Sequence, residues 1–138
     1  MKLQTLMLSG LALAALSGCN QPATPAAPTA APTEVAAVRT PPPQYPIELA
    51  CQGIGGTSTF KVVIDKDGTP GNVALVTGSG NGQLDERALK AVQGWEFKAA
   101  TRAGQAVATT IQVPVSFNPP QPKPDECFAV EERLRRGG

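Results

Sequence analysis

Alternation of apolar and polar residues predicts three strands between residues 57 and 117. In the segment 57–65, the apolar residues Phe60, Val62 and Ile64 point to one side of the predicted strand. The segment 73–77 shows a similar alternation. An Asp-Gly pair at 67–68 accepts the positive φ of a tight turn, so these two strands are expected to form a hairpin. The longest alternation covers 107–117 and predicts the last strand.

Two amphipathic segments predict helices that cover one face of this sheet. The segment 45–51 is typical of a short helix with Pro46 in its first turn. The segment 84–95 places its apolar residues on one stripe at helical spacing. The order helix, strand, strand, helix, strand predicts an α+β fold, a small two-layer domain with a three-stranded antiparallel sheet and two helices on one face. Pro114 cannot donate a ladder hydrogen bond, so part of the last strand is expected at a sheet edge.

The segment 1–18 is typical of a signal peptide. Lys2 supplies a positive charge, and the apolar run after it is shorter than the roughly 20 residues that a membrane-spanning helix needs. Leu16–Cys19 resembles the lipobox of bacterial prolipoproteins, in which the cysteine is acylated and becomes the new N-terminus. We therefore expect Cys19 to anchor the chain in a membrane. Asn20, by resemblance to lipoprotein sorting, favours the outer membrane; the alternative is a secreted protein in which Cys19 is incidental.

A tether is expected between this anchor and the domain. The segment 19–43 is rich in Pro, Ala and Thr and has too few large apolar residues to fold by itself. Its frequent prolines block helix formation and favour polyproline II, which makes a semi-rigid spacer. The alternative is a Pro-rich ligand for a partner, although no basic residue flanks a PxxP motif. The domain itself is expected to occupy 44–118.

Composition excludes several classes of function. The 138 residues contain 12 Lys and Arg against 11 Asp and Glu, which argues against a strongly basic nucleic-acid binder. No histidine is present, so histidine-based triads and histidine zinc ligands are excluded. The glycine-rich loop 78–82 has Gln83 where a dinucleotide-binding loop needs its third glycine. We therefore expect no enzymatic activity, cofactor, metal site or small-molecule substrate.

The cysteines predict that a disulfide joins the C-terminal tail to the domain. An even number remains once Cys19 is acylated, and a secreted chain enters an oxidising compartment. We expect Cys51 and Cys127 to form a disulfide, with pairing between two molecules as the alternative. The tail, 119–138, begins with closely spaced prolines that form a stiff connector and ends in a short amphipathic helix. The disulfide would fasten this helix to the first helix of the domain.

Several short motifs occur in the order and spacing of a known family. They are Pro43–Pro46, Gly56, Phe60–Asp65, Asp67–Gly68, Leu84–Asp85, Ala88–Leu89, Ala91–Val92, Trp95–Phe97, Gly104 and Val113–Phe117. Together they resemble the C-terminal domain of the TonB family, the periplasmic end of energy transducers. The resemblance covers 43–117 and implies the same two-helix, three-stranded fold.

The resemblance also implies a partner and a binding site. In the family, a short segment of an outer-membrane receptor adds as a strand beside the last strand of the domain. The residues of this chain that match the pairing edge are Val107, Thr109, Ile111 and Val113, and those that match the segment near the receptor's plug are Gln44, Tyr45 and Pro46. For Tyr45 and Pro46 the alternative is that they only begin the first helix.

The lipobox separates this chain from TonB transducers, which have an inner-membrane helix coupled to a proton-driven motor. A chain held in the outer membrane is not expected to transduce energy by itself. We therefore expect an outer-membrane lipoprotein that faces the periplasm and binds envelope proteins, either receptors or parts of a transport complex. The alternative is a structural subunit of an envelope or secretion complex that shares only the fold. The partners are thus other proteins and the membrane, not nucleic acid.

Overall fold

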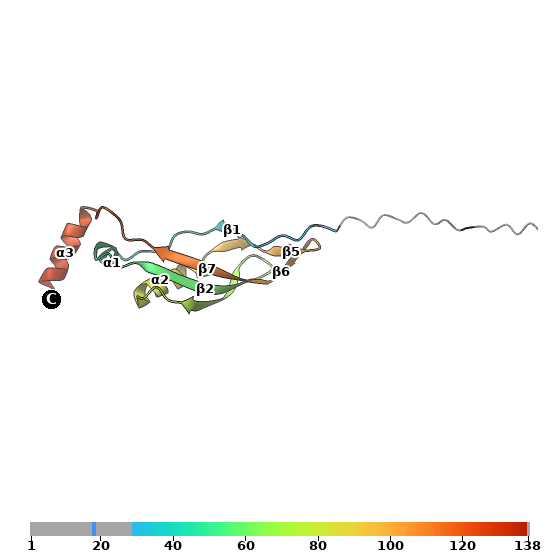
Figure 1. The fold of residues 1–138 in the computed structure, drawn as a ribbon, viewed down its shortest axis with the longest axis horizontal. Coiled ribbons are helices and arrows are strands. Elements are labelled where there is room, and N and C mark those ends of the chain that lie inside the picture. The colour runs from blue at the N-terminus through green and yellow to red at the C-terminus, as the bar shows by residue number, and fades with distance from the viewer. Residues whose placement is uncertain (1–17, 19–28, 138) are drawn as a thin grey trace, which may run out of the picture.

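The computed structural model describes Gly18 and residues 29–137 (Figure 1). The predicted signal peptide up to residue 17, the predicted lipidation site Cys19 and the first part of the predicted tether lie outside the described residues. Within the part that is described, no helix is both long and apolar enough to cross a membrane.

An antiparallel three-stranded sheet forms the centre of the domain. Its strands are β2 (Gly56–Ile64), β3 (Pro70–Thr77) and β7 (Thr109–Phe117). β2 lies in the middle, with β3 on one side and β7 on the other. The register of β2 with β7 runs without a shift from Gly56 opposite Phe117 to Ile64 opposite Thr109. The expected sheet and the edge position of its last strand are both confirmed.

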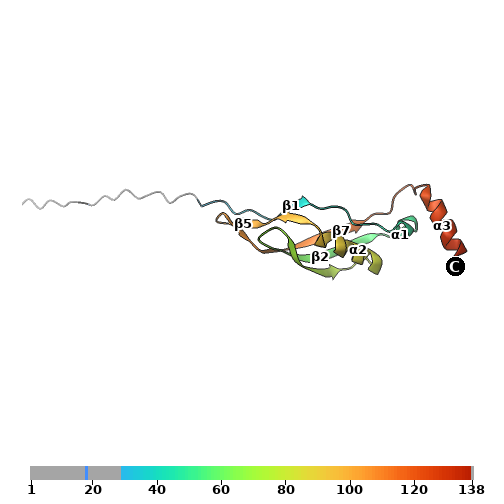
Figure 2. The same cartoon turned by 180° about the vertical axis from the view of Figure 1, so that it is seen from behind.

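Two helices bury their apolar faces against one face of this sheet. They are α1 (Ile47–Cys51) and α2 (Gly82–Gln93). The shared core contains Leu49, Phe60, Val62, Ile64, Leu84, Ala88, Val92, Phe97, Val113, Val115 and Phe117. α2 begins after Asn81, whose side chain accepts hydrogen bonds from the backbone N–H groups of Gln83 and Leu84. α2 lies beside β2 in both views (Figures 1 and 2), so the two-layer arrangement follows the amphipathic pattern.

Four short strands add a ribbon that the alternation pattern does not predict. They are β1 (Ala36–Arg39), β4 (Glu96–Lys98), β5 (Ala100–Arg102) and β6 (Gln105–Val107). β1 pairs with β4, and β5 forms a hairpin with β6. Thr33 and Thr101 extend the first pairing through backbone hydrogen bonds of 3.0 and 3.1 Å. Residues 33–39 therefore lie along the domain, although composition assigns them to the tether.

The last predicted strand, 107–117, is divided at Ala108. Val107 belongs to β6 and pairs with Ala100 of β5, whereas β7 begins at Thr109. The division arises because β6 turns back toward β5 in a hairpin, while β7 pairs with β2. Alternation alone does not distinguish two consecutive strands that pair with different partners.

The tail forms α3 (Glu126–Arg136), which packs against α1. Cys51, Cys127 and Val130 form a small buried cluster there, with Ile47 packed against it. α3 lies beyond the end of β7, at the opposite end of the domain from the β5–β6 hairpin (Figure 1). The tail helix is thus placed on α1 and not along the edge of β7.

Candidate partner-binding edge

β7 is an outer strand of the sheet. The hairpin between β2 and β3 shows which residues of β7 direct their backbone N–H and C=O groups away from the sheet. The Asp65 N–H donates a 2.9 Å hydrogen bond to the Thr69 carbonyl, so Asp65 directs its backbone toward β3. Backbone direction alternates along a strand, so Ile64 directs its own toward β7. Ile64 lies opposite Thr109. Thr109 therefore faces β2, and Thr110 faces the free side of the sheet.

Pro114 independently gives the same assignment. Proline has no N–H, and the register of β2 with β7 passes Pro114 without irregularity, so this residue fits a position directed away from β2. By alternation, Thr110, Gln112, Pro114 and Ser116 all face the free side. All of these except Pro114 offer both an N–H donor and a carbonyl acceptor, the groups that an added strand requires.

The predicted residues Thr109, Ile111 and Val113 lie in β7 but face inward. Their backbones are paired with β2. Val113 is buried in the core, and Ile111 packs against it. These residues hold the edge strand in place, whereas Thr110 and Gln112 present its backbone outward. The sequence contained a signal for this assignment. Because Pro114 has no N–H, it fits a position whose backbone is directed away from β2, and every second residue from it shares that direction.

Val107, the remaining predicted edge residue, is not on the free edge. Its backbone is paired with Ala100 in the β5–β6 hairpin. Ala103 and Gly104 form the turn of this hairpin with φ of 51° and 76°, the left-handed conformation that a two-residue hairpin turn requires. β7, and with it the free edge of the three-stranded sheet, begins after Ala108.

Tyr45 and Pro46 have structural contacts. The Tyr45 hydroxyl donates a 2.7 Å hydrogen bond to the Ile54 carbonyl, and its ring meets that of Phe117 edge-on at a centroid distance of 5.2 Å. Burial raises the pKa of Tyr45. The Pro46 carbonyl accepts a 3.0 Å hydrogen bond from the Ala50 N–H and so begins α1. These contacts support the reading in which both residues start the first helix.

Gln44 differs from its two neighbours because it is exposed. Its side-chain oxygen accepts a 3.2 Å hydrogen bond from Arg87 of α2. The two residues line a groove of about 350 Å³ between the segment 41–44 and α2, to which Lys90 also contributes. Of the three plug-side residues, Gln44 is the one whose side chain is available to a partner.

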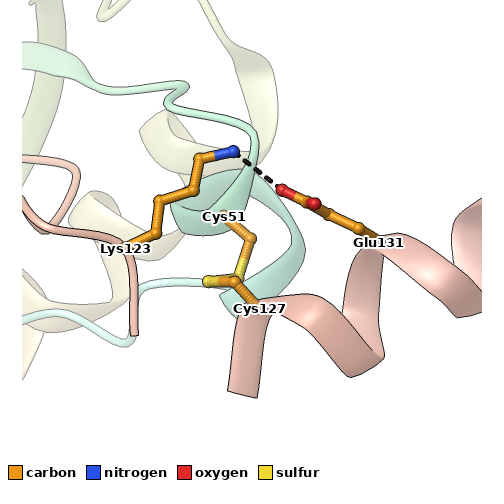
Figure 3. Close-up of a disulfide and its surroundings, with 4 residues drawn as sticks. All are labelled: Cys51, Lys123, Cys127 and Glu131. Carbon is orange, nitrogen blue, oxygen red and sulfur yellow. Dashed lines mark hydrogen bonds and ion pairs between the residues drawn. A yellow bond between two sulfur atoms is a disulfide. The ribbon is translucent and has the colours of Figure 1, made fainter. Parts of the chain in front are cut away.

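A disulfide joins the tail to the domain. Figure 3 shows Cys51 of α1 bonded to Cys127 at the start of α3, with an S–S distance of 2.02 Å. Beside it, Lys123 of the connector pairs with Glu131 of α3 at 2.7 Å. The disulfide thus joins α3 to α1 covalently, beside the small apolar cluster that the two helices share.

The acidic residues around the glycine-rich loop have structural roles. Asp85 accepts hydrogen bonds from the Ser58 hydroxyl and the Ser79 N–H, both at 2.7 Å. Burial alone would raise the pKa of Asp85, but these hydrogen bonds outweigh it and hold the pKa below its usual value. Asp67 is a turn residue that accepts hydrogen bonds from Thr69. Among the described residues, no group of three or more His, Cys, Asp or Glu is placed to hold a metal ion.

Comparison with known proteins agrees with this fold. The family model of the Gram-negative bacterial TonB protein C-terminal matches residues 41–119, more than half of the chain. Protein TonB of Xanthomonas campestris pv. campestris is 37% identical over 76 residues, which are 55% of this chain and 34% of that protein. Protein tonB2 of Pseudomonas aeruginosa is 34% identical over 77 residues, which are 56% of this chain and 28% of that protein. The match thus spans about a third of the length of these relatives or less.

A solved structure shows the same fold. The solution NMR structure of the Pseudomonas aeruginosa TonB C-terminal domain matches with a TM-score of 0.50 and 23% identity, over 66% of this chain and 90% of that one. The family model, the similar proteins and the fold agree: this chain belongs to the TonB C-terminal family.

Proposed function

We propose that this chain is an outer-membrane lipoprotein whose TonB C-terminal domain binds outer-membrane receptors or transport components by strand addition to β7. The observation that carries the proposal is the outward-facing backbone of Thr110 and Gln112 on the outer strand of the sheet. Both residues are exposed, and α3 lies beyond the end of the strand. An extended segment of a receptor would form its backbone hydrogen bonds there.

The N-terminal part of the chain would serve as the anchor. In this proposal the signal peptide 1–18 is removed and acylated Cys19 holds the chain in the outer membrane, with the domain in the periplasm. The tether would be shorter than composition suggests, because residues 33–39 pair with β4 and β5. Exposed Gln44 would contact the partner beside the added strand, while Tyr45 and Pro46 support the segment that carries it.

Substitution of Gln112 tests the binding mode. Gln112→Pro removes an outward-facing N–H from the middle of the free edge, and Gln112→Ala is the matched control that keeps this N–H. In cells that carry the tagged lipoprotein, chemical crosslinking followed by mass spectrometry should recover outer-membrane receptors with the native chain and the Ala variant. The Pro variant should lose this capture at an unchanged melting temperature.

Two results would contradict strand addition to β7. One is equal receptor capture by the Pro and Ala variants. The other is stoichiometric capture of subunits of an envelope or secretion complex, unaffected by either substitution, which would favour the structural role. The anchor is tested separately by Cys19→Ser, which should move the protein from the membrane fraction to the soluble periplasmic fraction.

A further inference from the structure

We infer that β7 offers its partner a short slot, Thr109–Val113, which begins where the strand is interrupted at Ala108 and which Pro114 closes at the other end. The inference rests on the proposed strand addition to β7 and adds the length and register of the segment that binds there. Each end of the slot follows from a different feature of the backbone.

The first end lies at Ala108, where the strand is interrupted between β6 and β7. Val107 pairs with Ala100, so the strand preceding the slot has its partner within the domain. β5 is also held from its other side, where Thr101 exchanges backbone hydrogen bonds with Thr33. An added strand that continued past Ala108 would leave the β7 sheet for this separate two-stranded sheet. Strand addition is therefore expected to stop at Ala108.

Pro114 closes the second end because it has no N–H. An added strand would meet outward N–H donors at Thr110 and Gln112, and the next donor only at Ser116. Alternate residues of a strand are about 6.8 Å apart, so the gap between the two donors is about 14 Å. A carbonyl of the partner opposite Pro114 would stay without a hydrogen-bond donor. Proline in this position is a known means of ending pairing at a sheet edge.

The slot defines the kind of partner that it fits. Thr110 and Gln112 together offer about four backbone hydrogen bonds, two donors and two acceptors. The partner would be a short extended peptide segment without proline at the two residues that lie opposite them. Both slot side chains are exposed and uncharged. Recognition would therefore rest on the peptide backbone, and an uncharged residue on this face of the partner would avoid burying a charge.

Site-specific photocrosslinking tests the slot in the full-length lipoprotein in cells. The photoreactive amino acid p-benzoylphenylalanine replaces Thr110, Gln112 or Ser116 in turn, and each replacement keeps its backbone N–H. Receptor crosslinks are expected from positions 110 and 112, and at least fivefold weaker ones from position 116. Pro114→Thr restores the missing N–H and should raise the crosslinks from position 116 to the level of position 112. The melting temperature of each variant verifies that the domain is folded.

The outcomes separate the slot from the proposed function. Equal crosslinking from positions 112 and 116 in the native background would overturn the slot while leaving strand addition intact. Failure of Pro114→Thr to raise the signal at position 116 would overturn the role of Pro114. Absence of receptor crosslinks from both 110 and 112 would overturn the slot together with strand addition to β7.

Discussion

The hydroxyl of Ser58 donates a 2.7 Å hydrogen bond to the carboxylate of Asp85, which joins the central strand β2 to the first turn of α2. Ser58 is completely buried. The same carboxylate oxygen accepts the Ser79 N–H, so it also fixes the loop that leads into the helix. A buried hydroxyl depends on such a partner, because no water reaches it.

Loss of this carboxylate should destabilise the domain. Asp85→Ala leaves the buried Ser58 hydroxyl without its acceptor, and we expect the free energy of unfolding to fall by about 2–3 kcal/mol. Urea denaturation measures the change. Glu86→Ala is the matched control, since Glu86 is exposed and only pairs with Lys90, and it should change stability by less than about 1 kcal/mol. Equal effects of the two substitutions would show that the Ser58–Asp85 hydrogen bond contributes little.

Asp85 should also make the free energy of unfolding fall at acid pH. Hydrogen bonds hold the pKa of Asp85 below its usual value in the folded state, so the charged form stabilises the fold. This contribution is complete above the unfolded-state pKa of about 3.9 and decreases as the pH falls through the lower folded-state pKa. Asp85→Asn should therefore show a flatter decline of stability below about pH 4 than the native chain. Urea midpoints of both chains between pH 7 and pH 2 test this. If the two midpoints fall in parallel below pH 4, the loss of stability in acid comes from other carboxylates.

Removal of the disulfide should release the tail. Cys51 and Cys127 are separated by 76 residues, and closure of a loop of this size stabilises the folded state by about 4–5 kcal/mol in the chain-entropy model. The double substitution to Ala should lower the free energy of unfolding by up to that amount. It should also make the amides of α3 exchange rapidly while those of β2 stay protected. Arg133→Ala, which removes an exposed ion pair with Glu48 between the same helices, should change stability by less than about 1 kcal/mol. Protected α3 amides in the double variant would mean that packing alone holds the tail.

Gln44 and Tyr45 are expected to differ although they are adjacent. Tyr45→Phe removes the hydrogen bond to the Ile54 carbonyl and should cost about 1 kcal/mol of stability without weakening receptor capture. Gln44→Ala should weaken receptor capture and leave stability within about 0.5 kcal/mol of the native chain. Melting curves and crosslinking yields of the two variants measure both quantities. The reverse pattern would make the tyrosine the contact with the partner.

The central sheet and both of its helices were predictable because their side chains repeat with a period of two or of 3.6 residues. Phe60, Val62 and Ile64 form a regular inward row, and Leu84, Ala88 and Val92 form a helical stripe. The short strands were not predictable in this way. β1 and β4 pair residues far apart in sequence, such as Ala37 with Phe97, and such short segments carry no alternation to detect.

The binding edge was predictable as a strand but not in its details. Alternation shows that the side chains of Ile111 and Val113 point toward the core. Which residues of β7 turn their backbone groups away from β2 depends on the register with β2. The pairing of Val107 with Ala100 depends on a hairpin turn at Ala103 and Gly104, and that segment has no strong turn signal before the glycine. The residues whose backbone groups are proposed to pair with a partner are therefore Thr110 and Gln112, which alternate with the predicted residues Thr109, Ile111 and Val113.

Amide hydrogen exchange measured by NMR on the purified chain tests the central claim most directly. An open β7 edge predicts rapid exchange at Thr110 and Gln112 and slow exchange at Ile111 and Val113, because only the latter two donate to β2. Addition of the periplasm-facing segment of a receptor recovered by crosslinking should then slow exchange at Thr110 and Gln112. Slow exchange at all four residues in the free chain, or no change at Thr110 and Gln112 on addition of the receptor segment, would contradict strand addition at this edge.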